Sequence, residues 1–239
     1  GKYDGMLGVV APVAMIKHFK QTKTQFPFHI DIVGFGDEEG TRFGSTLLGS
    51  RALVGNWPKE WADLEDADGI TLRQALTQFG LAFELVNDSK IDPNTLHGYV
   101  ELHIEQGPVL EQHNLAVGVV SAIAGARRFN FHVTGFAGHA GTVPMGLRQD
   151  ALAATSEMVL AVEQIATSQG IVATVGKIEN RPNGVNVISG NTQFSLDIRS
   201  DSDALRDNTL ERILPAFSDL AANSGVTVRH DTTPTDPPS

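Results

Sequence analysis

The sequence predicts an α/β fold built in two parts, and three observations point to it. Segments with helical and strand-like spacing alternate through the first half of the chain, which is typical of an α/β layer domain. From about Val117 the pattern changes to a self-contained block that reads strand, helix, strand, strand, helix, strand. The chain has 239 residues, 41% of them hydrophobic and 19% charged, which is enough for one large core or two modest ones.

The first part is predicted to contain three helices and two strands. The longest helix covers residues 8–20, where apolar residues crowd one side and Pro12 falls in the first turn. The segment 28–35 alternates polar and apolar residues, which predicts a half-buried strand. The remaining elements are two short helices and a second strand, over residues 46–53, 71–79 and 99–104.

The second part reads as a ferredoxin-like βαββαβ unit. Its first strand has Phe129, Phe131 and Val133 alternating with polar neighbours. The four strands and two helices are predicted over 128–135, 148–167 (helix), 171–178, 192–199, 203–222 (helix) and 226–230. The first helix is expected to bury Leu152, Met158, Val159, Val162 and Ile165.

Charge and composition narrow the range of partners. The net charge of -10 and the sequence pI near 5.2 argue against nucleic acid or an anionic membrane surface, because either would need a basic face. No apolar run is long enough for a transmembrane helix, and we expect a cytoplasmic protein. With no cysteine in the chain, only His, Asp and Glu remain as metal ligands.

Adjacent carboxylates follow the predicted strand at 28–35, in the run Asp37-Glu38-Glu39-Gly40. Acids side by side repel each other unless a cation or a proton lies between them. A solvated acidic turn is the alternative. The later segment Glu101-Leu102-His103-Ile104-Glu105-Gln106-Gly107 adds an imidazole, and the two runs together look like half of a dinuclear metal site that carries out hydrolysis.

Six segments in order resemble the amidase, hydantoinase and carbamoylase branch of the M20 metallopeptidase superfamily, and within it the allantoate amidohydrolases. The segments are Gly1-Lys2-Tyr3-Asp4-Gly5, Gly36-Asp37-Glu38-Glu39-Gly40-Thr41-Arg42-Phe43-Gly44, Glu101-Leu102-His103-Ile104-Glu105-Gln106-Gly107-Pro108, Gly138-His139-Ala140-Gly141, Arg181-Pro182-Asn183-Gly184-Val185-Asn186-Val187 and Asp197-Ile198-Arg199. The resemblance covers nearly the whole chain.

The resemblance implies two divalent metal ions, zinc or manganese, and a general base. Asp4 would bridge the two ions, Glu39 would bind one and His103 the other. Glu38 would be the catalytic base that moves a proton to the departing nitrogen. Without the resemblance, the favoured interpretation of Asp4 is a turn residue in Tyr-Asp-Gly, where Asp commonly caps the bend.

The resemblance also implies four further roles. His139 would stabilise the developing oxyanion and, in dimers, reach the active site of the neighbouring subunit. Gln106 would contact substrate near the metals, and Asn186 with Arg199 would hold the substrate carboxylate. A loop histidine bonded to its own backbone, and a solvated arginine at a strand end, remain the alternatives for His139 and Arg199.

The implied domains are a part of the metal-binding catalytic domain (1–116), a lid and dimerisation domain (117–232), and a return segment or tail (233–239). The family pattern also has a His-x-Asp before the position of Asp4 and a final ligand histidine, and these 239 residues contain neither. We therefore expect a fragment lacking both ends, which holds one metal ion or none.

The implied function is hydrolysis of the ureido group of allantoate, with release of ammonia and carbon dioxide. An N-carbamoyl-L-amino acid hydrolase or a β-ureidopropionase is the alternative, and aminoacylase or dipeptidase activity stays open. An inactive dimerisation module is the alternative from another class. The implied partners are a small anionic ureido or carbamoyl substrate and a second copy of the chain, bound through the lid.

Overall fold

The computed structural model describes residues 2–232 and divides the chain into two compact units. Unit 1 ends at Gly118 and unit 2 begins at Val119. The predicted return segment or tail, 233–239, lies outside the described residues. Each unit has its own hydrophobic core. No helix in the described part of the chain is long and apolar enough to cross a membrane.

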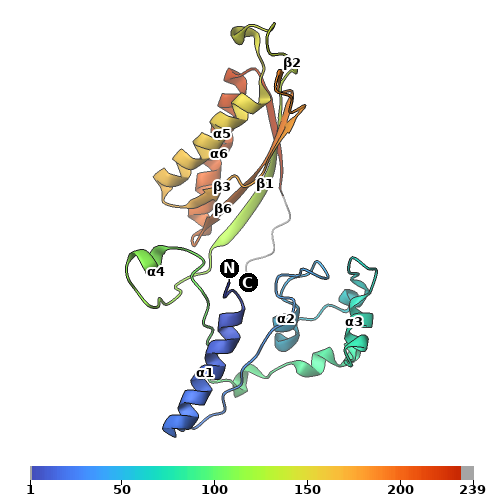
Figure 1. Ribbon diagram of the computed structural model, residues 1–239, viewed down its shortest axis with the longest axis vertical. Helices are drawn as coiled ribbons and strands as arrows, with labels where there is room; N and C mark the ends of the chain where they lie inside the picture. The colour runs from blue at the N-terminus through green and yellow to red at the C-terminus, as the bar shows by residue number, and fades with distance from the viewer. Residues whose placement is uncertain (1, 233–239) are drawn as a thin grey trace. The chain divides into compact units, whose positions relative to one another are not determined.

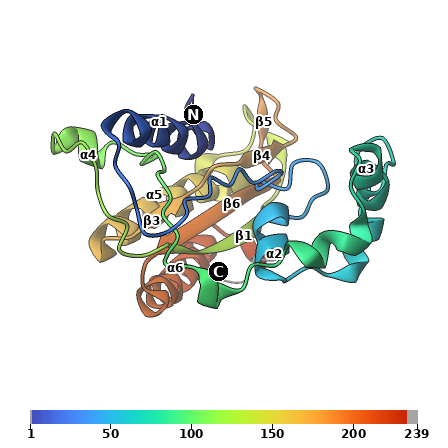
Figure 2. The same cartoon turned by 90° about the horizontal axis from the view of Figure 1, so that it is seen from below.

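Unit 1 is helical and loop-rich, with its apolar core around Trp61 and Phe83. Its helices are α1 (Met6–Thr22), α2 (Leu48–Val54), η1 (Lys59–Asp63), α3 (Leu72–Gln78), η2 (Phe83–Ser89), η3 (Pro93–Thr95) and α4 (Val109–Gln112). Figures 1 and 2 both show α1 lying apart from α2 and α3. The core cluster is confined to the part of the unit that contains α2, η1, α3 and η2.

Helix α1 is longer than the sequence predicts and buries no residue. It begins at Met6, so Pro12 lies inside the helix and the prediction that Pro12 falls in its first turn is wrong. Gly8 lets another segment approach closely, since a Cβ there would lie 3.2 Å from the carbonyl oxygen of Leu102. Val10 and Val13 on the apolar side are 57% and 54% exposed.

The two strands predicted in unit 1, over 28–35 and 99–104, are wrong: neither segment is a strand in the structure. The apolar alternation is present, but a strand also needs a hydrogen-bonded neighbour, and among the described residues neither segment pairs with one. The apolar side chains at positions 28, 30, 32 and 33 are accordingly 38% to 42% exposed.

Unit 2 is built on an antiparallel sheet. The sheet contains β1 (Gly125–Thr134), β3 (Val172–Thr174), β4 (Ile178–Arg181), β6 (Asn191–Ser200) and β7 (Thr227–Thr232). Its order is β3-β6-β1-β7, and β4 also pairs with β6. The single strand predicted over 171–178 is instead divided between β3 and β4. A separate ribbon pairs β2 (Gly138–His139) with β5 (Val187–Ile188).

Two helices, α5 (Ala151–Gln169) and α6 (Asp203–Asn223), lie on one face of this sheet (Figure 1). Phe129, Phe131 and Val133 of β1 and every second residue of β6 are buried, with Phe131 stacked on Phe194 at 5.1 Å between ring centroids. The Asp150 side chain caps α5 by accepting two backbone N–H bonds, so the helix begins three residues later than predicted. Leu152, predicted to be buried, is 38% exposed.

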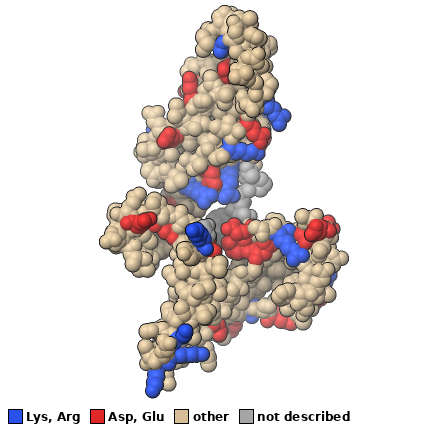
Figure 3. Space-filling view, in the orientation of Figure 1, with Lys and Arg blue, Asp and Glu red and all other residues tan. Residues whose placement is uncertain are grey.

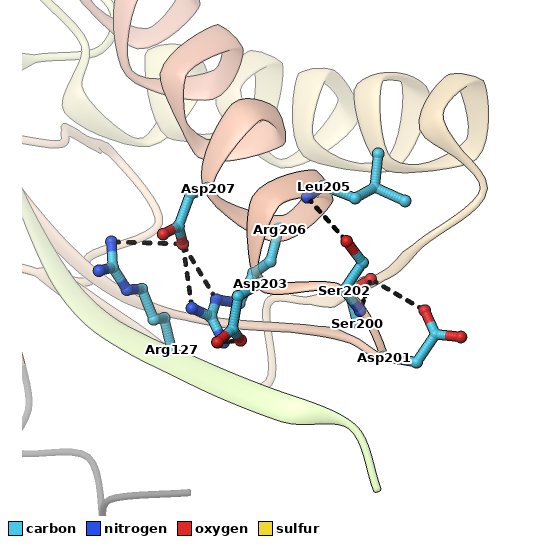
Figure 4. A network of polar contacts seen from close by, with 8 residues as sticks. All are labelled: Arg127, Ser200, Asp201, Ser202, Asp203, Leu205, Arg206 and Asp207. Atoms are coloured by element: carbon cyan, nitrogen blue, oxygen red, sulfur yellow. Dashed lines mark hydrogen bonds and ion pairs between the residues drawn. The ribbon is translucent and has the colours of Figure 1, made fainter. Parts of the chain in front are cut away.

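A buried arginine fastens the start of α6 (Figure 4). Arg206 is 8% exposed and donates to Asp203 Oδ1 at 2.6 Å and, through Nε, to Asp207 Oδ1 at 3.1 Å. The same carboxylate lies 3.5 Å from Nη1 of Arg127 on β1. This network therefore links the first strand to the second helix. On the face drawn in Figure 3, acidic and basic side chains lie in small groups beside one another.

Candidate active-site residues

Three of the predicted site residues meet in unit 1. Gln106 donates its Nε2–H to Asp4 Oδ2 at 2.6 Å, and His103 Nε2 lies 3.5 Å from Asp4 Oδ1. The other ring nitrogen of His103 lies 2.6 Å from the backbone carbonyl oxygen of Ile104. These residues come from opposite ends of unit 1, and the close approach of the chain at Leu102 to α1 brings them together.

The contact with Gln106 has an electrostatic consequence for Asp4. An amide N–H that donates to a carboxylate stabilises its charged form. The pKa of the Asp4 carboxyl is therefore lowered, with the Gln106 hydrogen bond as the main cause and His103 as a smaller one. Gln106 reaches this position from a backbone with φ of 56°, a left-handed conformation that is uncommon outside glycine.

The acidic run forms a tight turn whose first residue turns inward. Asp37 has φ of 49°, and its Oδ1 accepts from Thr41 Oγ1 at 2.9 Å. Gly40 closes the turn with φ of 68°, where a Cβ would lie 2.7 Å from the backbone of Ser45. Glu38 and Glu39 themselves are exposed. The turn therefore presents the two predicted functional carboxylates outward and uses the third, Asp37, to hold its own shape.

The described residues fit a divalent metal ion in part. Asp4 and His103 supply an oxygen and a nitrogen donor from neighbouring positions, a combination that suits zinc or manganese. Within residues 2–232, however, no three His, Asp or Glu side chains gather closely enough to hold an ion. Glu39 does not join the other two predicted ligands.

In unit 2, the structure brings His139 and Asn186 together at one end. The β2–β5 ribbon pairs His139 with Val187, and the Ala140 N–H donates to the Asn186 carbonyl oxygen at 3.0 Å. The Gly141 N–H donates to His139 Nδ1 at 3.1 Å. A neutral imidazole that accepts at Nδ1 carries its proton on Nε2, so His139 presents Nε2–H as a donor.

Arg199 lies near the opposite end of the same sheet. The register pairs Arg199 with Ala126 at the start of β1, and Asn191 with Thr134 at its end. Eight residues of strand separate Arg199 from Asn191, which is about 26 Å at ~3.3 Å per residue. Figure 1 shows β2 at the end of unit 2 away from the start of β1. The structure therefore does not bring Arg199 to His139 and Asn186 within one chain.

The sequence analysis gave no role to Asp197 and Arg148, which hold candidate site residues, or to Arg128, which contacts Asp197. Asp197 accepts from both Arg199 and Arg128. Arg148 donates to the carbonyl oxygens of Ala140 and Val143, which lie in the loop that carries His139. The Asp-x-Arg spacing in a strand was a usable signal for Asp197, because residues two apart lie on one face. The contacts of Arg148 had no signal in the sequence.

Comparisons with known proteins agree with these segments. The profile of the peptidase family M20/M25/M40 matches residues 1–234. The N-carbamoyl-L-amino acid amidohydrolase of Geobacillus stearothermophilus is 39% identical over 227 residues, covering 95% of this chain and 56% of the relative. An allantoate deiminase of Arabidopsis thaliana is 36% identical over 230 residues, covering 86% of this chain and 44% of the relative.

A solved structure shows the same fold over the matched region. A hydantoinase/carbamoylase family amidase from Burkholderia ambifaria superposes with a TM-score of 0.87 at 33% identity, over 99% of this chain and 57% of that one. The chain spans about half the length of the curated relatives that it matches. It therefore belongs to the peptidase family M20/M25/M40, in the branch that contains the hydantoinase/carbamoylase amidases.

Proposed function

We propose that the protein is a metal-dependent amidohydrolase that cleaves the ureido or carbamoyl group of a small carboxylic acid. The observation that carries the proposal is the meeting of Asp4 with His103 and Gln106, since Asp4 and Gln106 are 102 residues apart in the sequence. Relatives named for ureido and carbamoyl substrates support the substrate class. In this proposal residues 1–116 belong to the catalytic domain.

Asp4, Glu39 and His103 would hold the metal ions, and Gln106, which donates to Asp4 Oδ2, would orient the Asp4 carboxylate. Divalent ions in such sites act as Lewis acids and make water more acidic. Glu38 takes the proton from the attacking water as it adds to the carbonyl carbon. When the C–N bond breaks, Glu38 gives that proton to the departing nitrogen. The carbamate that remains then releases carbon dioxide and ammonia.

His139 would stabilise the oxyanion that develops on the carbonyl oxygen. The hydrogen bond from Gly141 to Nδ1 leaves Nε2–H as the donor, which is the tautomer that this role needs. Removing one donor of this kind from a preorganised site costs ~2.7–4 kcal/mol of transition-state stabilisation. The alternative is a loop histidine that bonds its own backbone. This alternative explains the hydrogen bond at Nδ1 but gives no role to the Nε2–H group.

The separation inside unit 2 supports a dimer. A small ureido acid cannot span the ~26 Å between the ends of β6. We therefore assign His139 and Asn186 of one copy, and Arg199 of the other, to each substrate. Residues 117–232 would form the ferredoxin-like lid through which the two copies pair. Asn186 and Arg199 of the same chain would then serve different substrate molecules.

Mixing two inactive variants tests this sharing. Glu38→Gln and His139→Ala each inactivate every site in their own homodimer. In a mixed dimer one site keeps both Glu38 and His139, so mixing restores up to about a quarter of the wild-type rate. A mixture that stays inactive while size-exclusion chromatography and mass spectrometry show mixed dimers would contradict the assignment.

Ammonia release tests the reaction itself. We would assay the 239-residue chain beside a version extended at both ends to the length of its relatives, with Glu38→Gln as the matched control, and measure bound zinc and manganese. The proposal expects metal and ammonia release in the extended protein and no release in the Glu38 variant. An extended protein that folds, binds metal and hydrolyses neither allantoate nor N-carbamoyl amino acids would sink it.

Allantoate is the substrate we propose first, because Phe43-Gly44-Ser45-Thr46 and Thr142-Val143-Pro144-Met145-Gly146 look closest to that subgroup. N-carbamoyl-L-amino acids are the second candidate, and the 39% identity to an N-carbamoyl-L-amino acid amidohydrolase favours them. Comparing kcat/KM for allantoate and for several N-carbamoyl amino acids decides between the two. Absence of allantoate turnover beside fast N-carbamoyl turnover would reverse our order.

A further inference from the structure

The sheet face of unit 2 that α5 and α6 leave uncovered carries a cluster of three charged side chains. In the antiparallel register Arg128 on β1 pairs with Asp197 on β6, and Val172 on β3 pairs with Arg199. Residues paired in this way point to the same side of a sheet. Their chain neighbours Leu196 and Ile198 are fully buried on the helix side, so Arg128, Asp197 and Arg199 share the open side.

Asp197 joins the two guanidinium groups. Arg199 donates Nε–H to Oδ1 at 2.9 Å and Nη2–H to Oδ2 at 2.9 Å, which is a bidentate pair. Arg128 donates Nε–H to Oδ2 at 3.1 Å. The Asp197 side chain is 27% exposed, and those of Arg128 and Arg199 are 48% and 50% exposed. The carboxylate is therefore the inner member of the cluster, and both cations face outward.

The cluster keeps an excess of positive charge and unused donors. Two cations and one anion leave a net charge of +1. A guanidinium has five N–H groups, and Asp197 takes only the Nε side of each arginine. Among the described residues, the structure gives no hydrogen bond donated by Nη1 of either arginine. The pKa of Asp197 is lowered, chiefly by the hydrogen bond from Arg199, which keeps the carboxylate charged.

The three side chains line an open cavity of about 580 Å³. Known ligand pockets measure ~300–1,000 Å³, so a small organic acid fits easily. Val172 and Thr174 from β3 form an apolar and a hydroxyl-bearing side of the cavity, and Asn130 from β1 also lines it. A cavity with a cationic end and a partly apolar wall is suited to an acid that has a short uncharged body.

We propose that Arg128 and Arg199 bind one carboxylate together in this cavity, and that Asp197 is a positioning residue that fixes the Arg199 fork. That the carboxylate belongs to the substrate rests on the function proposed above. Arg199 offers its outer Nη1/Nη2 edge, because Asp197 already occupies the Nε/Nη2 edge. Arg128 then contributes the second charge from the neighbouring strand. A purely structural ion-pair cluster that ties β1 to β6 is the competing interpretation.

Binding of N-carbamoylglycine to the 239-residue chain, measured by calorimetry, separates the two interpretations. We expect tighter binding of this acid than of its uncharged amide, and weaker binding at high salt. Arg128→Gln should weaken binding ~3- to 10-fold and Arg199→Gln ~10-fold or more, the magnitudes of partly exposed charge-assisted hydrogen bonds. Arg128→Lys, which keeps the charge but loses the fork, should fall between Arg128→Gln and wild type.

Arg127→Gln is the matched control. It removes the same charge one position away, from a side chain that pairs with Asp207 on the helix side. It should leave the Kd within about twofold. For Asp197→Asn we expect a smaller preference for N-carbamoylglycine over its sulfonate analogue, because the planar fork is no longer fixed.

Three results would overturn the inference: no preference of wild type for the acid over its amide, an Arg128→Gln variant that binds like Arg127→Gln, or an unchanged acid-to-sulfonate ratio in Asp197→Asn. Ammonia release by the extended protein is scored separately. Binding that follows these variants without hydrolysis would refute the proposed function and leave the anion site standing. Hydrolysis with a KM that is unchanged in Arg128→Gln would support the proposed function and refute the anion site.

Discussion

The loop that carries His139 depends on Arg148, and replacing this arginine with glutamine should loosen it. Arg148 donates Nη2–H to the Ala140 carbonyl oxygen at 2.7 Å and Nε–H to that of Val143 at 3.1 Å. The loop has other bonds of its own, from the Thr142 and Val143 N–H groups to the His139 carbonyl oxygen, both at 3.2 Å. Arg148 therefore supplies the contacts that tie this turn to the start of α5.

The magnitude follows from these two bonds. A hydrogen bond that involves a charged group contributes ~1.5–3 kcal/mol. Arg148 is half-buried and the freed carbonyl oxygens can turn to water, so we take the lower end and expect ~1.5–3 kcal/mol for both bonds together. Because ~1.4 kcal/mol is a factor of ten, the open form of the loop should become ~10- to 100-fold more populated.

Amide hydrogen exchange of the 239-residue chain measures this directly. Exchange at Thr142 and Val143 should speed up ~10- to 100-fold in Arg148→Gln, while amides in the middle of β6 change far less. The ¹⁵N shifts of the His139 ring should move toward those of a free imidazole as Nδ1 loses the Gly141 bond. In the extended protein kcat should fall ~10-fold with little change in KM, since an oxyanion donor acts in the transition state.

Arg212→Gln, an exposed change on α6, is the matched control for lost charge. Unchanged exchange at Thr142 and Val143 in Arg148→Gln would refute the reasoning, because the loop would then be held by its own turns. A fall in kcat without faster exchange would place Arg148 in contact with the substrate instead of the loop.

Three further predictions concern unit 2. The pKa of the Asp197 carboxyl is lowered, so its ion pairs stabilise the folded state fully above the ordinary carboxyl pKa, near 3.9. This stabilisation is lost as the pH falls through the lowered pKa. In urea titrations, the difference in unfolding free energy between wild type and Asp197→Asn should be constant from pH 7 to 5 and become smaller below pH 4. Met158→Ala, at a fully buried position, should lower the free energy of unfolding by ~2–5 kcal/mol and lower the urea midpoint without changing the slope of the transition. A loss below about 1 kcal/mol would show that the surrounding core fills the cavity left by the Met158 side chain. Arg206→Met should lower the free energy of unfolding by ~1–3 kcal/mol, less than loss of a fully buried ion pair, because the Asp203 side chain is 70% exposed and becomes hydrated. Thermal melts followed by circular dichroism measure this loss. An unchanged Tm would mean that the Ser202 cap alone holds the start of α6.

The sequence predicted unit 2 well because its alternation and capping signals are local and each of its predicted strands finds a hydrogen-bonded neighbour in the same unit. The alternation at Phe129, Phe131 and Val133 marks the buried face of β1, and the structure pairs this strand with β6, whose Phe194 and Leu196 alternate in the same way. The division of 171–178 was missed because the alternation continues across the gap between β3 and β4, although only the ends pair with β6.

Unit 1 was predicted less well because its strand signals need partners. Alternation at 28–35 indicates which side chains want burial, but a strand exists only where another backbone supplies the hydrogen bonds. The helices α2 and α3 were predicted to within two residues at each end, since caps are local: Thr71 forms a capping box with Gln74. Helix α1 was also predicted, but it buries no residue, and Val10 and Val13 on its apolar side are more than half exposed.

The candidate site shows the same limit from the chemical side. The motifs identified the residues, and the structure brings together His139 and Asn186, which the β2–β5 ribbon joins. What a motif does not state is distance. His139 follows the end of β1, and Arg199 is the second-last residue of β6, which runs antiparallel to β1. Both strands have ten residues and pair along their whole length, so His139 and Arg199 lie near opposite ends of the sheet. Under the proposed function, a substrate that needs both residues would take them from two copies, and the proposed carboxylate site pairs Arg199 with Arg128 on the neighbouring strand.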